Sequence, residues 1–114
     1  MSDVRWPGDW LRGVLELCVL GALAEEPTYG YAIAGRLEAA GLGPVRGGTL
    51  YPLLARLQAE QLVEATWQAG DGGPGRKYFT LTSTGHAELV SRTRMWRRFV
   101  EGTWRLLPDA EEVQ

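Results

Sequence analysis

The hydrophobic pattern of this 114-residue chain changes its period at Leu62, from the spacing of a helix to the alternation of a strand. Apolar residues alternate with polar ones as far as Gln68, and a segment of aromatic and β-branched residues returns from Arg76 to Thr82. The glycine-rich residues 69–75 between them predict a flexible turn. Because an isolated hairpin is only marginally stable, these two strands must pack against the helices around them.

Helical patterns occupy the segments before the hairpin. Residues 10–24 are apolar nearly all round, so this helix needs a second packing partner besides its own domain. Residues 29–40 form a second helix, for which Thr28 is the expected N-cap. A third helix is expected to begin near Gly48 or Thr49, and its apolar stripe consists of Leu50, Leu53, Leu54 and Leu57.

A long helix is predicted after the hairpin, from residue 83 to 107, where Pro108 ends it. Its apolar residues follow a spacing close to that of a coiled-coil seam: Leu89, Trp96, Val100, Trp104 and Leu107. We expect this helix to be the second partner of residues 10–24, within the same chain or across two subunits.

The chain lacks most of the side-chain combinations on which enzymes and metal sites depend. Cys18 is the only cysteine and His86 the only histidine, which excludes an intramolecular disulfide, a multi-cysteine metal site and a histidine-based triad. We therefore expect no metal, no cofactor and no enzymatic activity.

The first nine residues do not resemble a signal peptide, and no apolar stretch reaches the ~20 residues of a membrane span. These features predict a cytoplasmic protein.

The order of elements is that of a winged helix-turn-helix. We expect a mainly α fold with a two-stranded β-wing, in which residues 10–82 form the domain. Residues 83–107 form the appended C-terminal helix, and residues 1–9 and 108–114 are flexible termini. This architecture suits DNA because one exposed helix fits the major groove while the hairpin reaches the neighbouring backbone.

Candidate DNA-binding residues lie in the third helix and at the base of the wing. The hydroxyls of Thr49 and Tyr51 stand near a helix N-terminus, where backbone amides also attract phosphate, and Arg56 can reach a base edge or a phosphate. The remaining candidates supply positive charge: Arg46, Arg76 and Lys77. Other interpretations remain open, because Tyr51 also suits a core position, and Arg56 can pair with Glu60 one turn later.

Four motifs resemble the PadR family of transcriptional regulators. They are LELCVLGAL at residues 15–23, YGY at 29–31, GTLYPLL at 48–54, and RKYFTLT at 76–82 with Gly85. The resemblance spans residues 11–107 and is similar to the subfamily that has a single C-terminal helix. It implies a homodimeric repressor in which Tyr29, Thr49 and Tyr51 contact phosphates or bases and Lys77 contacts the backbone. The segment Arg46-Gly47-Gly48 departs from the family pattern. This departure leaves open, by one or two residues, where the third helix begins, which is the helix expected to enter the major groove and is called the reading helix below.

The same resemblance implies that the last helix forms the dimer interface. We expect that interface to contain Leu11, Leu15, Leu89, Trp96, Val100, Trp104 and Leu107. Two reading helices would then lie about one DNA turn apart, ~34 Å, which predicts a pseudo-palindromic operator on double-stranded DNA. Trp96 and Phe99 allow two interpretations. Either a small planar aromatic effector stacks between the Trp96 side chains of the two subunits, or Trp96 simply fills the dimer interface.

The formal net charge of −2 favours a rival function, in which a winged helix contacts another protein and binds no DNA. Binding to promoter DNA over a range of salt concentrations separates the two functions.

Overall fold

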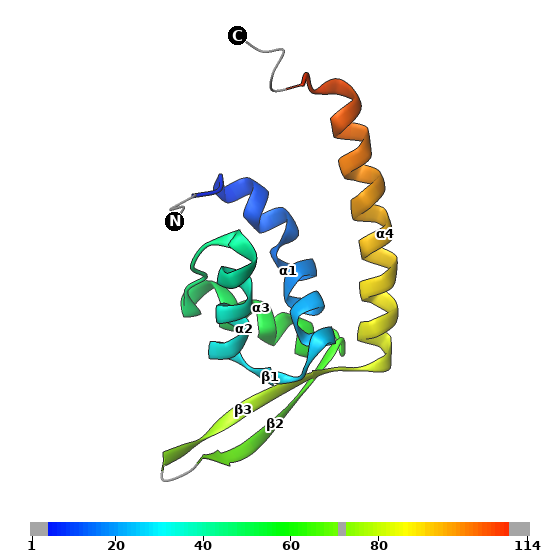
Figure 1. The fold of residues 1–114 in the computed structure, drawn as a ribbon. Coiled ribbons are helices and arrows are strands. Elements are labelled where there is room, and N and C mark those ends of the chain that lie inside the picture. Colours follow the sequence, from blue (N-terminus) through cyan, green and yellow to red (C-terminus); the bar gives the residue numbers. More distant parts are fainter. Residues whose placement is uncertain (1–4, 71–72, 110–114) are drawn as a thin grey trace.

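A computed structural model describes residues 5–70 and 73–109 of the chain (Figure 1). Helices α1 (Gly8–Glu25), α2 (Gly30–Leu37) and α3 (Gly47–Ala59) form a helical body, and a π-helical turn, η1 (Glu38–Leu42), follows α2. Strands β2 (Val63–Gly70) and β3 (Gly73–Leu81) extend from this body as a wing. Helix α4 (Ser83–Leu106) then runs beside α1 and beyond it. The mainly α winged fold expected from the sequence is confirmed.

The sheet has three strands where two were predicted. The short strand β1 (Thr28–Tyr29) pairs antiparallel with β3, giving the order β1-β3-β2. Thr28 is opposite Phe79 in this pairing and is buried, so its prediction as the N-cap of the second helix was wrong. Tyr29 is the N-cap residue, because extended pairing with β3 continues up to the first residue of α2.

The wing is longer than predicted. Its strands extend to Gly70 and resume at Gly73, so the prediction of a flexible turn over residues 69–75 was wrong for the part that is described; residues 71–72 lie outside the described residues. Gly70 pairs with Gly73 beyond an irregularity that begins at Gln68. Gly75 passes so close to the opposite strand that an added Cβ would lie 2.9 Å from the carbonyl oxygen of Gln68. Glycine here allows close strand pairing, where the sequence had suggested only flexibility.

The core lies where α1, α2 and α3 meet the inner face of the sheet. Its aliphatic residues include the predicted stripe of α3, and α1 contributes Leu15, Val19, Leu20 and Leu23. Phe79 and Leu81 close the core from β3. One stripe of α1 is therefore used inside the domain, as expected for its first packing partner.

The first helix begins and the last helix ends within two residues of the positions predicted from the sequence. Helix α1 begins at Gly8, two residues before the predicted start, and Trp6 Nε1 donates a 2.8 Å hydrogen bond to the carbonyl oxygen of Gly41. Part of the predicted flexible segment 1–9 thus has a defined structure, while residues 1–4 and 110–114 lie outside the described part. Helix α4 ends at Leu106, one residue before the prediction.

Hydrogen bonds join the turn that follows α3 to the start of α4. Thr82 caps α4 by accepting a 2.8 Å hydrogen bond from the Gly85 amide, and its backbone N–H donates to the Leu62 carbonyl at 3.1 Å. The Thr82 hydroxyl oxygen also lies 2.8 Å from the carbonyl oxygen of Gln61, whose φ of 63° is left-handed. This bond helps to hold a non-glycine residue in a conformation that such residues rarely adopt. The base of α4 is therefore fixed to the turn that follows α3.

Candidate nucleic-acid interface

Helix α3 presents a face of small side chains to solvent. Leu50, Leu53, Leu54 and Leu57 are buried, as predicted. At 100° per residue, the ridge opposite this stripe consists of Gly48, Pro52, Ala55 and Ala59, all of them exposed. A helix with so little bulk on its outer ridge can lie deep in a groove, and the longer side chains on its two flanks can then reach outward.

Tyr51 lies on one flank of α3 and packs against the start of α2. A Cβ added to Gly30 would lie 2.7 Å from the Tyr51 ring and hydroxyl, and one added to Gly47 would lie 3.3 Å from the ring. The Tyr51 side chain is nevertheless 53% exposed. Tyr51 is therefore held in place by backbone on two sides while its remaining surface faces solvent, so it is not the core aromatic that the sequence left open.

The wing carries a second group of aromatic and basic side chains. The guanidinium carbon of Arg76 lies 4.6 Å from the centre of the Tyr29 ring, and that ring lies 6.1 Å from the ring of Tyr78. Arg76 and Tyr78 are two residues apart on β3, so they share one face of the sheet, and Tyr29 joins them from β1. Because Tyr29 precedes Gly30 directly, this group neighbours Tyr51. Sequence reasoning missed Tyr78, although alternation along the strand would have placed it beside Arg76.

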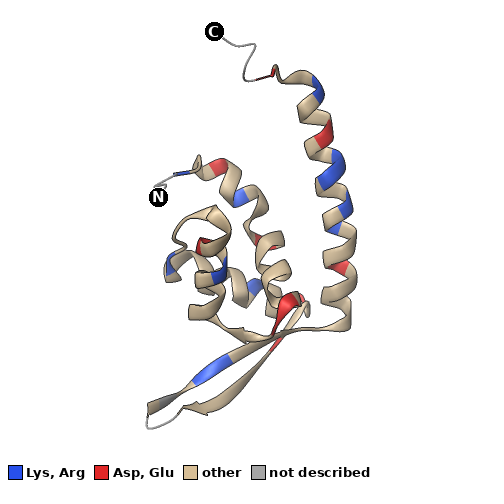
Figure 2. Cartoon of the chain, viewed as in Figure 1, with Lys and Arg blue, Asp and Glu red and all other residues tan. Residues whose placement is uncertain are grey.

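Lys77 points to the opposite face of the wing. Its Nζ lies 5.9 Å from the ring centre of Phe79, and its cross-strand partner is Trp67, which is 73% exposed. The sequence placed Arg76 and Lys77 at the base of the wing, but they pair with Gln68 and Trp67, nearer its tip. As successive residues of a strand, they also face opposite sides. Figure 2 shows lysine and arginine on β3 and along α4.

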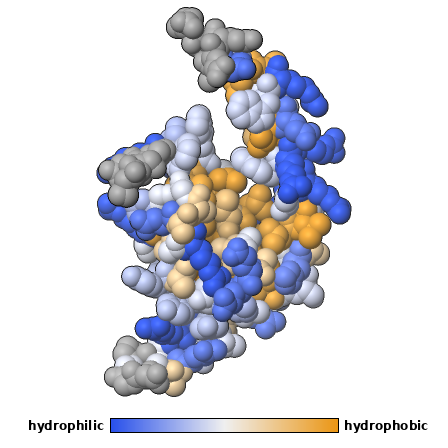
Figure 3. Space-filling view, viewed as in Figure 1, coloured by the Kyte–Doolittle hydropathy of each residue, from blue (hydrophilic) through white to orange (hydrophobic). Residues whose placement is uncertain are grey.

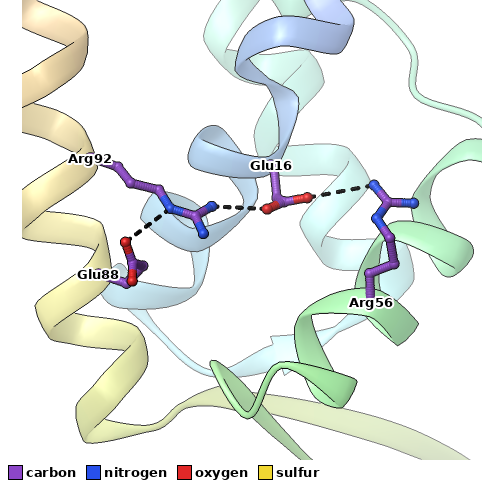
Figure 4. Close-up of polar contacts among 4 residues, drawn as sticks. All are labelled: Glu16, Arg56, Glu88 and Arg92. Atoms are coloured by element: carbon purple, nitrogen blue, oxygen red, sulfur yellow. Dashed lines mark hydrogen bonds and ion pairs between the residues drawn. The ribbon is translucent and has the colours of Figure 1, made fainter.

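Arg56 stands apart from the tyrosines, on the other flank of α3. Its Nη2 lies 3.5 Å from Oε2 of Glu16 on α1, and its side chain is 60% exposed (Figure 4). The pair with Glu60 that the sequence left open is not among the ion pairs of the described residues, which join Arg56 to Glu16 instead.

Arg46 and Thr49 lie at the amino end of α3. Arg46 is the N-cap residue, its carbonyl accepts from the amides of Thr49 and Leu50 at 3.0 and 2.9 Å, and both Arg46 and Thr49 are exposed. Helix α3 thus begins at Gly47, which resolves the uncertainty over its start. The positive end of the helix dipole and the charge of Arg46 coincide here, an arrangement that favours a phosphate.

The expected dimer residues range from buried to exposed, with Val100 half-buried and Leu107 exposed. Leu15 is buried in the chain's own core, and Leu11 and Leu89 pack partly against it. Towards the end of α4 exposure is high: Trp96 is 37% exposed, Phe99 63% and Trp104 64%. The Trp96 and Phe99 rings lie 5.6 Å apart. Figure 3 shows a broad apolar area in the middle of the view, over the body and the lower part of α4, and only small apolar spots among hydrophilic surface along the upper part of α4, beside an open notch between that part and the body.

Two ionisable groups near α1 have shifted pKa values. The hydrogen bond to Glu16 raises the pKa of Arg92, with partial burial opposing it and Glu88 adding to it. Burial raises the pKa of the Cys18 thiol. Among the described residues, histidine, cysteine and acidic side chains nowhere gather in threes as a metal site would require. Within the same residues, no helix combines the length and apolar character needed to cross a membrane.

Comparison with known proteins places this geometry in a family. Residues 19–91 match the model of the "Transcriptional regulator PadR-like family". A PadR-like transcriptional regulator from Bacillus cereus is 36% identical, with a TM-score of 0.79 over 90% of this chain and 99% of that one. An uncharacterised protein from Lysinibacillus sphaericus is 30% identical over 95 residues, which are 82% of this chain and 87% of that protein. Bacillus subtilis PadR, solved in complex with operator DNA, shares the fold at 24% identity and a TM-score of 0.64, over 70% of this chain and 45% of that one. The chain belongs to the PadR-like family of transcriptional regulators.

Proposed function

We propose that the chain is a sequence-specific DNA-binding repressor that acts as a homodimer. One observation carries the proposal: the amino end of α3, the fixed ring of Tyr51 and the Arg76–Tyr29 pair form neighbouring parts of one exposed surface. Hydroxyls and cations are the groups that contact phosphates and base edges. The proposed DNA-binding residues are Tyr29, Arg46, Thr49, Tyr51, Arg56, Arg76 and Lys77.

The operator complex of Bacillus subtilis PadR supports a DNA partner for a chain of this fold. A family of transcriptional regulators also agrees with the expectation that this chain is not an enzyme. Because bacterial DNA lies in the cytoplasm, a chain that binds it acts there.

Dimerisation would cover the exposed apolar face of α4. Large exposed apolar side chains that gather on one face mark interaction sites, and three exposed aromatic side chains stand on one projecting helix, namely Trp96, Phe99 and Trp104. In the proposed dimer these side chains, with Val100 and Leu107, pack against α1 and α4 of the second subunit. Two copies of α3 would then meet successive major grooves of a pseudo-palindromic operator.

An effector would act at the Trp96–Phe99 pair. A planar aromatic molecule stacked there between two subunits would change the dimer geometry and release DNA, provided that it binds one geometry more tightly than the other. Titration with planar aromatics tests this step: Trp96→Ala should abolish their quenching of tryptophan fluorescence, and unchanged titrations would assign Trp96 to the seam alone.

The test of the main proposal is binding to a labelled duplex from the promoter of the protein's own gene. We expect a specific complex whose affinity falls steeply with salt, because phosphate contacts release counterions. Absence of any complex at low salt would instead favour a winged helix that contacts another protein, the function favoured by the net charge of −2.

A further inference from the structure

The carboxylate of Glu16 on α1 lies between the reading helix and the long C-terminal helix (Figure 4). Its Oε1 accepts a 2.8 Å hydrogen bond from Nη1 of Arg92 on α4, and its Oε2 lies 3.5 Å from Nη2 of Arg56 on α3. Glu88 holds Arg92 from within α4, with 3.3 Å between Oε1 and Nε. One side chain therefore links three helices.

Among the described residues, polar contacts join α4 to the body at this link and also at its base. At the base, Thr82 bonds to the Leu62 carbonyl, and an added Cβ at Gly85 would lie 2.0 Å from that carbonyl oxygen. Arg92 lies ten residues after Thr82, about 15 Å along the helix at 1.5 Å per residue. Above the base, Leu89 packs partly against the core, and the directional contact at Arg92 adds to this apolar packing in setting the direction of the helix.

The length of α4 amplifies any tilt. The helix has 24 residues and therefore extends about 36 Å, so a displacement at Arg92 becomes more than twice as large at its far end. The exposed aromatic side chains stand on that outer part, beyond Arg92. The Glu16 and Arg92 side chains are only 29% and 32% exposed, so water screens their ion pair less than it screens a fully exposed pair.

We propose that Glu16 is a positioning residue that sets the angle between α4 and α3, and thereby the separation of the two reading helices in the dimer. The inference rests on the proposed function, since the separation matters only if a dimer binds two half-sites. Glu16 needs no contact with DNA for this role. Its effect is passed on through Arg92 to α4 and through Arg56 to α3.

The experiment measures tolerance to half-site spacing. The wild-type protein first selects duplexes from a random-sequence library, and the selected half-site is then placed in inverted pairs whose separation changes by single base pairs. Because off-register half-sites require deformation of DNA or protein, we expect wild-type affinity to fall about tenfold for one base pair of change. In Glu16→Gln, a near-isosteric side chain without charge, we expect that penalty to shrink to about threefold as the angle loosens. Arg92→Gln should behave alike, and the double variant should add nothing further, because either change breaks the same link.

Arg12→Gln is the matched control. Arg12 is also on α1 and pairs with an acidic residue, but that residue is Asp9, one turn away on the same helix. Its spacing profile should equal that of the wild type. If the affinity of Glu16→Gln depends on half-site spacing as sharply as that of the wild type, and is lowered equally at every spacing, the role of Glu16 is merely structural. That result would overturn this inference and leave the proposed function standing. If the wild-type protein selects no duplex, both the proposed function and this inference fail.

Discussion

The ring of Tyr51 lies against the α-carbon of Gly30, so closely that the smallest side chain at position 30 would overlap it. The contact joins α3 to the first residue of α2. It links the motifs YGY and GTLYPLL of this chain, because the glycine of the first makes room for the tyrosine of the second.

Gly30→Ala should weaken DNA binding more than it weakens the fold. The added methyl group would lie 2.7 Å from the Tyr51 ring, and that half-exposed ring can swing into solvent to relieve the overlap. We expect the affinity for the selected duplex to fall about tenfold, in line with the loss of one good contact. Gly35→Ala on the same helix is the control, because an added Cβ there meets nothing within 4 Å. Equal affinity of the two variants would separate Tyr51 from DNA binding.

Arg76→Ala should lower affinity on all sequences alike and reduce the salt dependence. A wing arginine that contacts phosphate contributes about one unit to the slope of log K against log salt concentration. Arg98→Ala, which removes the same charge from an exposed position on α4, controls for net charge. Anisotropy titrations at several salt concentrations measure the slope for each variant, and identical slopes for Arg76→Ala and Arg98→Ala would place Arg76 outside the interface.

Gly85→Ala should strongly destabilise the protein. The new Cβ would lie 2.0 Å from the carbonyl oxygen of Leu62, a backbone atom that cannot move without breaking its bond from Thr82. We expect a loss of about 2–3 kcal/mol in the free energy of unfolding, as for overpacked interiors. Gly102→Ala, in the same helix but with nothing within 4 Å of its added Cβ, should instead gain up to about 1 kcal/mol from helix propensity. Urea unfolding of both variants makes the comparison, and equal stabilities would contradict it.

Trp104→Glu should convert the dimer into a monomer. Placing a carboxylate on the exposed apolar face of α4 requires its desolvation in the interface. Sedimentation equilibrium should report about 12.6 kDa for the variant and twice that mass for the wild type. Trp67→Glu is a matched control, since Trp67 is similarly exposed but lies on the wing. A dimeric Trp104→Glu would move the interface away from the end of α4.

Cys18 should react slowly with thiol reagents and should cost stability at alkaline pH. Burial raises the pKa of its thiol in the folded state above the ordinary value of 9.0. The folded chain therefore holds this proton more tightly than the unfolded chain, so the associated stability is present below pH 9 and is lost as the pH rises through the folded-state pKa. Cys18→Ala should flatten the stability profile in that range, and urea midpoints from pH 8 to 10 test it.

Local features of the chain were predictable, because their causes lie within a few residues. The stripe from Leu50 to Leu57 follows from helical spacing, and Thr82 caps α4 through a bond that spans only three residues. Long-range partners were not predictable in the same way. The two residues of β1 become a strand only because Phe79 and Tyr78 lie opposite them. Arg56 had a local candidate in Glu60, yet its partner is Glu16, forty positions away, which only the packing of α1 on α3 reveals.

The bond between Thr82 and Leu62 has a consequence for engineering. These two residues flank the wing and meet at its base, so the whole hairpin is an excursion whose ends are already fastened together. Lengthening such a closed excursion costs little, since loop-closure entropy grows only slowly with length. The outer part of the wing, beyond the pairing of Tyr29 with Tyr78 and the core residue Phe79, can therefore be lengthened or exchanged between relatives while the helical body and α4 stay unaltered.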